Sequence, residues 1–261
     1  MLKYDIRTGA KRIKTKIDVT KSLMGLVALA LPAVLFLSTG GALAASGYSL
    51  FGDAELVSPG NASPKAVQIR SDADPGFGGV RYDIPAGTTF ADLGVLSTDF
   101  MVESDDLCVG GSPRFQVRVD TNGDNVGDAN IFVYYGIDSA STPCVPGTWQ
   151  NTTDLLEAGK LLDTSQLGGT FYHEYTLAVA AYGSYKVTGV NTVVDSSWAH
   201  PDSEQTVLID NTNVDGTVYT YDQPQNKDEC KKGGWMNLTD QNGDSFKNQG
   251  QCVSWTNGRG Q

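Results

Sequence analysis

Oxygen-bearing side chains recur at short intervals in one glycine-containing segment, at Asp120, Asn122, Asp124 and Asp128. Carboxylate and amide oxygens in this kind of spacing, with glycine relieving the backbone, are what Ca²⁺ requires in a short loop. Position 12 of the segment is Ile131, where the helix-loop-helix calcium motif needs Glu, so that motif is excluded. We therefore expect either a calcium loop of another type or a solvated turn, in which Asp, Asn and Gly are favoured for conformational reasons alone.

Aromatic residues in expected loops offer a second kind of chemistry. Trp149 and Trp198 each follow a turn-forming segment, and Tyr134 lies at the end of an apolar run. An exposed ring can stack on the CH-rich face of a sugar while nearby polar groups meet its hydroxyls. The alternative is that the two tryptophans cover the ends of a buried core. On the first interpretation, Trp149, Trp198 and Tyr134 bind a carbohydrate.

Motifs for catalysis are incomplete. His173-Glu174 begins like the H-E-x-x-H helix of zinc proteases, but Leu177 stands where the second histidine is needed. The G-x-S-x-G nucleophile elbow and the phosphate-binding P-loop are both missing. We therefore predict no catalytic residues and a protein that is not an enzyme. A hydrolase acting on polysaccharides remains an alternative, since it needs only two suitably spaced carboxylates.

These side chains must be positioned by short strands, because apolar runs alternate with Gly, Pro, Asp and Asn clusters from residue 46 to 222. In the run from Arg114, the residues Phe115, Val117 and Val119 alternate with polar ones and should face inward. Asp215-Gly216 predicts a tight hairpin. The expected strands are Lys65–Ser71, Gly79–Ile84, Gly94–Val102, Arg114–Val119, Ile131–Tyr135, Tyr185–Val194, Gln205–Asp210 and Thr217–Tyr221.

One segment departs from this pattern. From Thr170 to Ala181 the apolar spacing is helical, and Gly183 follows as a stop signal. Many short strands with one short helix predict an all-β fold, a jelly-roll-like sandwich of two sheets. The polar segment Asp222–Asn226 has linker character. We expect a β-sandwich domain over residues 46–222 and a small disulfide-clasped C-terminal element over 223–261.

The N-terminus resembles an export signal. Seven of the 19 Lys and Arg residues precede residue 22, and the apolar run Leu23–Leu37 and the small-residue site Ala42-Leu43-Ala44 follow. This order is typical of a secretory signal peptide, here residues 1–45. The alternative is an uncleaved anchor, although Pro32 interrupts the run. We expect a secreted product, extracellular or on the cell surface, with no membrane association after cleavage.

Four cysteines fit an oxidising compartment. They can pair in more than one way, but their positions favour two local pairs, Cys108 with Cys144 and Cys230 with Cys252. Zinc binding is disfavoured, because there is no Cys-x-x-Cys pair and the two histidines are far from the cysteines in sequence. We interpret both pairs as structural disulfides.

Charge excludes one class of partner. The residues after 45 carry 12 Lys and Arg against 28 Asp and Glu, a net charge of −16. Such a surface repels phosphate and lacks the cations that release counterions from nucleic acid. We therefore expect no nucleic-acid partner.

The C-terminal segment carries two motifs, Cys230-Lys-Lys-Gly-Gly-Trp235 and Phe246-Lys-Asn-Gln-Gly-Gln-Cys252-Val-Ser. It resembles a short ending found on many secreted bacterial proteins, which implies bacterial export and a Cys230–Cys252 clasp around Trp235 and Phe246. The inserted stretch between Asp240 and Asp244 departs from the shorter form. The expected body is similar to carbohydrate-binding β-sandwiches at the level of fold only, and the Asp120 segment resembles calcium loops of extracellular β-proteins.

The sequence thus predicts a secreted binding protein without enzymatic activity. Its expected partner is a carbohydrate or a cell-wall or other cell-surface polymer. Calcium stabilises the body if the Asp120 segment is a calcium loop, and has no such role if the segment is a solvated turn. One alternative is a structural surface or matrix protein without a small ligand. The second is the polysaccharide-active hydrolase.

Overall fold

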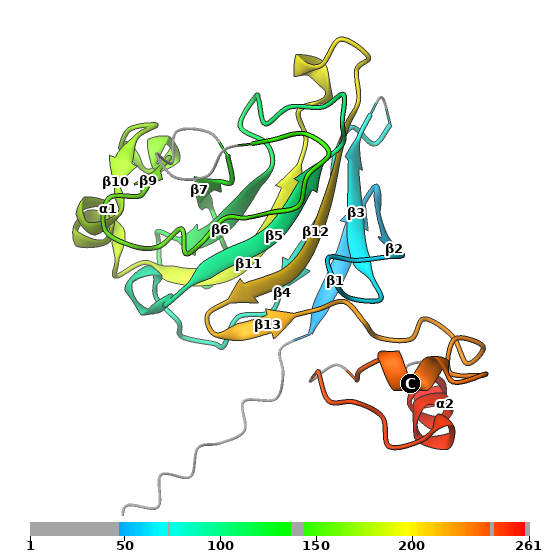
Figure 1. Ribbon diagram of the computed structural model, residues 1–261. Coiled ribbons are helices and arrows are strands. Elements are labelled where there is room, and N and C mark those ends of the chain that lie inside the picture. Colours follow the sequence, from blue (N-terminus) through cyan, green and yellow to red (C-terminus); the bar gives the residue numbers. More distant parts are fainter. Residues whose placement is uncertain (1–46, 73, 137–143, 241–242, 259–261) are drawn as a thin grey trace, which may run out of the picture. The chain divides into compact units, whose positions relative to one another are not determined.

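The computed structural model describes residues 47–72, 74–136, 144–240 and 243–258, and the expected signal peptide lies outside them. Its strands form two large antiparallel sheets (Figure 1). The first sheet has the order β1 (Tyr48–Gly52), β4 (Gly78–Tyr82), β11 (Lys186–Val194), β6 (Arg114–Asp120) and β7 (Ala129–Tyr134). The second has the order β2 (Ala54–Val57), β3 (Ala66–Ser71), β12 (Gln205–Val214), β5 (Leu96–Val102) and β8 (Gln150–Asn151), with β13 (Thr217–Tyr219) paired to β12.

The two sheets share one core, and this confirms the predicted all-β sandwich. The chain changes between the two sheets repeatedly, from β1 to β2, β3 to β4, β4 to β5, β5 to β6, β7 to β8, and β11 to β12. Each expected strand is present within a few residues of its predicted bounds. Strands β1 and β2 were not predicted, because Gly52 and Asp53 interrupt the apolar alternation between them.

Alternating side chains build the core as the sequence predicts. Phe115, Val117 and Val119 of β6 are fully buried, as are Val207 and Ile209 of β12. Their polar neighbours on β6 therefore point to the outer face of the first sheet. Because β6 lies between β11 and β7, this outer face brings side chains from three strands together.

Tyrosine hydroxyls inside the core are paired with threonines. Thr192 contacts the hydroxyls of Tyr82 and Tyr135 at 3.2 and 2.7 Å, and the Tyr82 hydroxyl lies 2.7 Å from that of Tyr221. Burial raises the pKa of Tyr82 to about 12, so the network stays protonated and neutral.

The predicted helix is present as α1 (Tyr175–Tyr182) but begins five residues later than expected. His173 and Glu174 instead form β10, which pairs with β9 (Leu161–Leu162), and Glu174 caps the helix by accepting from the Leu177 N–H. Phe171 therefore lies before the helix and is exposed. A second helix, α2 (Gln249–Gly258), was not predicted.

Both predicted disulfides are present, Cys108–Cys144 and Cys230–Cys252. The C-terminal residues form their own apolar cluster, in which Cys230, Cys252 and Phe246 are buried and Trp235 packs against them. Within the described ranges, no helix combines the length and apolar character needed to cross a membrane.

Candidate functional site

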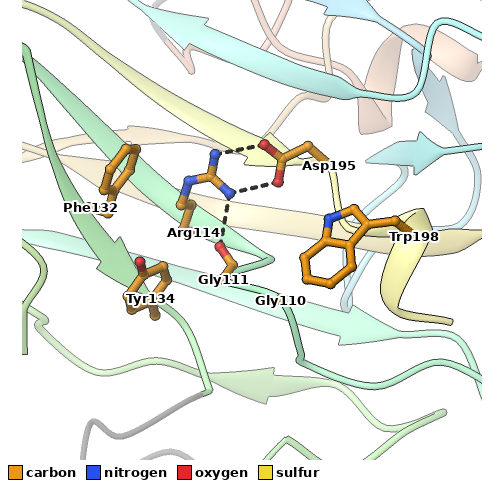
Figure 2. Close-up of a pocket in the computed structure, with 7 residues that line it drawn as sticks. All are labelled: Gly110, Gly111, Arg114, Phe132, Tyr134, Asp195 and Trp198. Atoms are coloured by element: carbon orange, nitrogen blue, oxygen red, sulfur yellow. Dashed lines mark hydrogen bonds and ion pairs between the residues drawn. The ribbon is translucent and has the colours of Figure 1, made fainter. Parts of the chain in front are cut away.

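Tyr134 and Trp198, two of the three aromatic residues predicted to bind sugar, lie at the same surface hollow. The hollow has a volume of about 220 Å³ and lies at the end of the outer face of the first sheet (Figure 2). We call it the Arg114 hollow after its central residue. Its lining consists of Gly110, Gly111, Arg114, Phe132, Tyr134, Asp195 and Trp198.

Arg114 is held rigidly at the first position of β6. Its two terminal nitrogens, Nη1 and Nη2, each lie 2.7 Å from an oxygen of Asp195, so the ion pair is bidentate. Nη1 also donates to the carbonyl of Gly111 at 2.9 Å. The guanidinium lies 5.0 Å from the ring centroid of Phe132, in the geometry of a cation–π contact. The side chain of Arg114 is only 11% exposed, whereas that of Asp195 is 34% exposed.

The opposite wall is the turn at Gly110 and Gly111, whose φ angles of +64° and +81° favour glycine. The absence of side chains also lets two rings approach the backbone. A Cβ at Gly110 would lie 3.0 Å from the indole of Trp198, and one at Gly111 would lie 3.2 Å from the ring of Tyr134. The disulfide at Cys108 tethers this turn to the segment after β7.

The phenol of Tyr134 is oriented by Asp163. Its hydroxyl donates to Oδ2 of Asp163 at 2.7 Å, and the backbone of Asp163 pairs with Phe132 at the edge of β7. Burial and the hydrogen bond to Asp163 raise the pKa of Tyr134 well above its ordinary value. The hydroxyl therefore keeps its proton for Asp163 and presents its oxygen lone pairs as acceptors.

Gln205, the first residue of β12, connects the glycine turn to the segment that carries Trp198. These two segments are the walls that Gln205 joins. Its side-chain nitrogen donates to the carbonyls of Leu107 and Ser112 at 2.8 and 3.3 Å. Its side-chain oxygen accepts from the hydroxyls of Ser112 and Ser196 at 2.6 and 2.8 Å. Because Ser196 immediately precedes the short helix η3 (Ser197–Ala199), Gln205 sets the position of Trp198 relative to the glycine turn.

Trp149 is not among the residues that line the hollow. It directly precedes β8 on the second sheet and is partly buried. Trp198 differs sharply from it, since 74% of its surface is exposed. The structure thus separates the two tryptophans that the sequence treated alike.

The Asp120 segment forms the loop between β6 and β7, and its carboxylates bind its own backbone. Asp120 accepts from the N–H groups of Asn122, Gly123 and Asn125, at 3.1, 2.7 and 2.8 Å. Burial alone would raise the pKa of Asp120, but these donors together outweigh it and lower the pKa.

The other oxygen-bearing side chains of this loop are engaged in the same way. Asp128 accepts from the N–H and hydroxyl of Thr121, Asn122 accepts from Asp124, and Asp124 accepts from Val126. Across the described residues, no group of three or more His, Cys, Asp or Glu side chains is placed to hold a metal ion. Calcium binding, which would also draw on Asn122 and backbone oxygens, stays a prediction.

Sequence reasoning did not single out Arg114, Asp195, Phe132 or Gln205 as site residues. The alternation in β6 places Arg114 on the outer face, and this was the one available signal. Asp195 reaches Arg114 through the pairing of β11 with β6, and Phe132 lies on β7, which also pairs with β6. Gln205 comes from the other sheet and bonds Leu107 and Ser112, just before β6.

Comparison with known proteins gives no relative. No family model, no curated protein and no solved structure matches this chain. The function must therefore be argued from the geometry of the Arg114 hollow.

Proposed function

We propose that this chain is a secreted protein without enzymatic activity that recognises a carbohydrate, such as a cell-surface polymer, through the Arg114 hollow. The observation that carries the proposal is the convergence of Tyr134 and Trp198, predicted as sugar-stacking residues, beside the Arg114–Asp195 ion pair. Trp198 is 74% exposed, so its ring is available to a ligand beside the ordered polar groups of Arg114 and Asp195.

The chemistry of the hollow suits a sugar ring. The indole of Trp198 offers an apolar face for the CH side of the ring, and Tyr134 offers a second aromatic surface. The carboxylate of Asp195 and the phenol oxygen of Tyr134 can accept hydrogen bonds from hydroxyl groups. Because Asp163 holds the Tyr134 phenol and Arg114 holds the Asp195 carboxylate, little side-chain entropy is lost on binding.

Two observations support the export part of the proposal. All four cysteines are joined in disulfides, which persist in oxidising compartments outside the cytoplasm. The sequence of residues 1–45 has the order of a signal peptide. N-terminal sequencing of the mature protein from its native host tests this part, and an intact residue 1 would contradict it.

Binding is tested with the mature protein and a panel of insoluble and soluble polysaccharides, including cellulose, chitin, mannan, xylan and peptidoglycan sacculi. We expect W198A to weaken binding to the retained polysaccharide about 30-fold, which corresponds to about 2 kcal/mol. The melting temperature should hold, because Trp198 is exposed. W149A is the matched control and should bind like the wild type.

Three outcomes would contradict the proposal. If W198A binds the polysaccharide with wild-type affinity, the Arg114 hollow is not the binding site. Failure of the wild type to bind any polysaccharide, together with self-association on sedimentation, would favour the structural surface protein. Release of new reducing ends from a bound polysaccharide would favour the hydrolase.

A further inference from the structure

We infer that the Arg114 hollow selects an uncharged, hydroxyl-rich sugar ring and rejects glycans that carry carboxylate or phosphate groups. This inference rests on the proposed function and adds the class of ligand. An arginine at the centre of a surface pocket usually indicates the opposite preference, because a free guanidinium grips an anion through two parallel N–H groups. The contacts of Arg114 within the protein exclude bidentate binding of a ligand anion.

The donors of Arg114 are already used. Nη1 donates to Asp195 and Gly111, and Nη2 donates to Asp195 and, at 3.4 Å, to Gln116. The remaining donor, Nε, is buried and has no hydrogen-bond partner in the described structure. No pair of N–H groups is left at the surface, so an anionic ligand could be gripped only by breaking the bond to Asp195.

The charge of Arg114 is neutralised by the same contacts. Asp195 supplies one negative charge at 2.7 Å, and Phe132 covers a face of the guanidinium. Asp163 places a second carboxylate at the edge of the hollow, bonded to Tyr134. One cation against two carboxylates leaves the immediate surroundings negative, and a ligand carboxylate would add like-charge repulsion.

The two oriented polar groups that the hollow presents to a ligand, on Asp195 and Tyr134, are acceptors. Each carboxylate oxygen of Asp195 has a lone pair beyond the one used by Arg114, and the side chain is 34% exposed. Tyr134 adds its phenol oxygen, since its proton is directed to Asp163. Hydroxyl groups of a neutral sugar can donate to these oxygens, whereas carboxylate and phosphate groups bring acceptors of their own.

The net charge of the wider surface also disfavours anionic ligands. Residues 46–226 carry 7 Lys and Arg against 24 Asp and Glu, a net charge of −17. This field slows the approach of anionic polymers at low ionic strength, but salt screens it. A preference that persists in high salt must therefore come from the hollow.

The test uses two derivatives of whichever neutral polysaccharide the wild type binds, one hydroxyethylated and one carboxymethylated to the same degree. The two derivatives have similar bulk and differ in charge. We expect the carboxymethyl form to bind at least about tenfold more weakly in high salt, as measured by affinity electrophoresis or calorimetry. W198A should weaken binding of the hydroxyethyl form about 30-fold, as for the parent polysaccharide.

D195N is the diagnostic variant, because it removes the charge that occupies Arg114 while keeping one oxygen acceptor. It should reduce the discrimination against the carboxymethyl form at least about threefold. D83N is the matched control, since it makes the same change of net charge at an exposed residue outside the hollow. Equal effects of D83N and D195N would overturn the inference.

Failure of the inference can be told from failure of the proposed function. If the wild type prefers the carboxymethyl form and W198A abolishes that binding, the hollow binds carbohydrate but its class is anionic. If neither derivative nor any polymer of the panel binds, the proposed function fails and the inference fails with it.

Discussion

Arg114 and Asp195 are 81 residues apart in the chain, yet they form a bidentate ion pair with two contacts of 2.7 Å. The pairing of β6 with β11 brings them together, because Val193 lies directly opposite Arg114 and Asp195 follows two residues later. The pair joins the start of β6 to the loop that carries Trp198. We expect the integrity of the hollow to depend on it.

Replacing Asp195 by Ala should lower the free energy of unfolding by about 1–3 kcal/mol, because the nearly buried Arg114 loses its counter-charge. The cost is below that of a fully buried pair, since Asp195 is partly exposed. A double-mutant cycle with R114A, measured by urea denaturation, should give a coupling energy above about 0.5 kcal/mol. Additive effects of the two substitutions would show that the pair contributes nothing as a pair.

Gln205 should act as a positioning residue for both walls of the hollow. Q205A removes four hydrogen bonds at a fully buried site, so we expect a loss of about 2–4 kcal/mol in the free energy of unfolding. Amide exchange should accelerate in residues 107–112 and 196–200 together. Q150A is the control, because Gln150 bonds the loop at Val145 and Thr148 outside the hollow. Unchanged exchange in either wall of Q205A would contradict this role.

Asp210 should make the protein more stable in mild acid. It lies opposite Asp99 across β5 and β12, and burial raises its pKa to about 6, above the ordinary 3.8. The folded state therefore binds this proton more tightly than the unfolded state, and its contribution to stability is lost as pH rises through 6. From pH 4 to 7 we expect a fall of about 2 kcal/mol from this group.

The measurement is the urea midpoint of unfolding at several pH values between 4 and 8. D210N should flatten the slope, although Asp106 and Asp222, whose pKa values burial also raises, keep part of it. D92N is the control, because hydrogen bonds from Thr89 lower the pKa of that exposed carboxyl. An identical slope in wild type and D210N would rule out Asp210 as the cause.

Asp120 should stabilise its loop whether or not calcium is present, because its carboxylate accepts three backbone N–H groups. D120A is therefore expected to lower the melting temperature in both chelator and calcium. If calcium also binds, as the sequence predicts, it should raise the melting temperature of the wild type but not of the D120N/D124N/D128N variant. Calorimetry with identical heats for these two proteins would refute the calcium site.

Much of the sandwich could be predicted from local pattern. The alternation at Phe115, Val117 and Val119 determines which face of β6 is buried, because successive side chains of a strand point to opposite sides. The Asp215-Gly216 hairpin follows from two residues that tolerate positive φ, observed here at +52° and +85°. Both signals lie within one element, so neither needs knowledge of distant parts of the chain.

The start of α1 shows where local pattern was insufficient. The apolar spacing predicted a helix from Thr170, but the helix begins only at Tyr175. His173 and Glu174 pair with Leu161 and Leu162 as strands and do not join the helix. Strand pairing between these residues satisfies backbone groups that a longer helix would have had to satisfy within itself. The competing partner lies eleven or more residues away, outside any local window.

By itself, the sequence determined most strands of the sandwich and the inward face of β6, favoured the two cysteine pairs, and supplied the aromatic residues available for binding. Only the tertiary structure decided that Tyr134 and Trp198 line one hollow and that Trp149 lies apart. It also decided that Asp195 forms an ion pair with Arg114. The physical reason is that strand formation follows from the period of nearby side chains, whereas a surface site depends on which strands become neighbours. Neighbouring strands are chosen by how the two sheets bury their shared core, and that choice involves the whole chain at once.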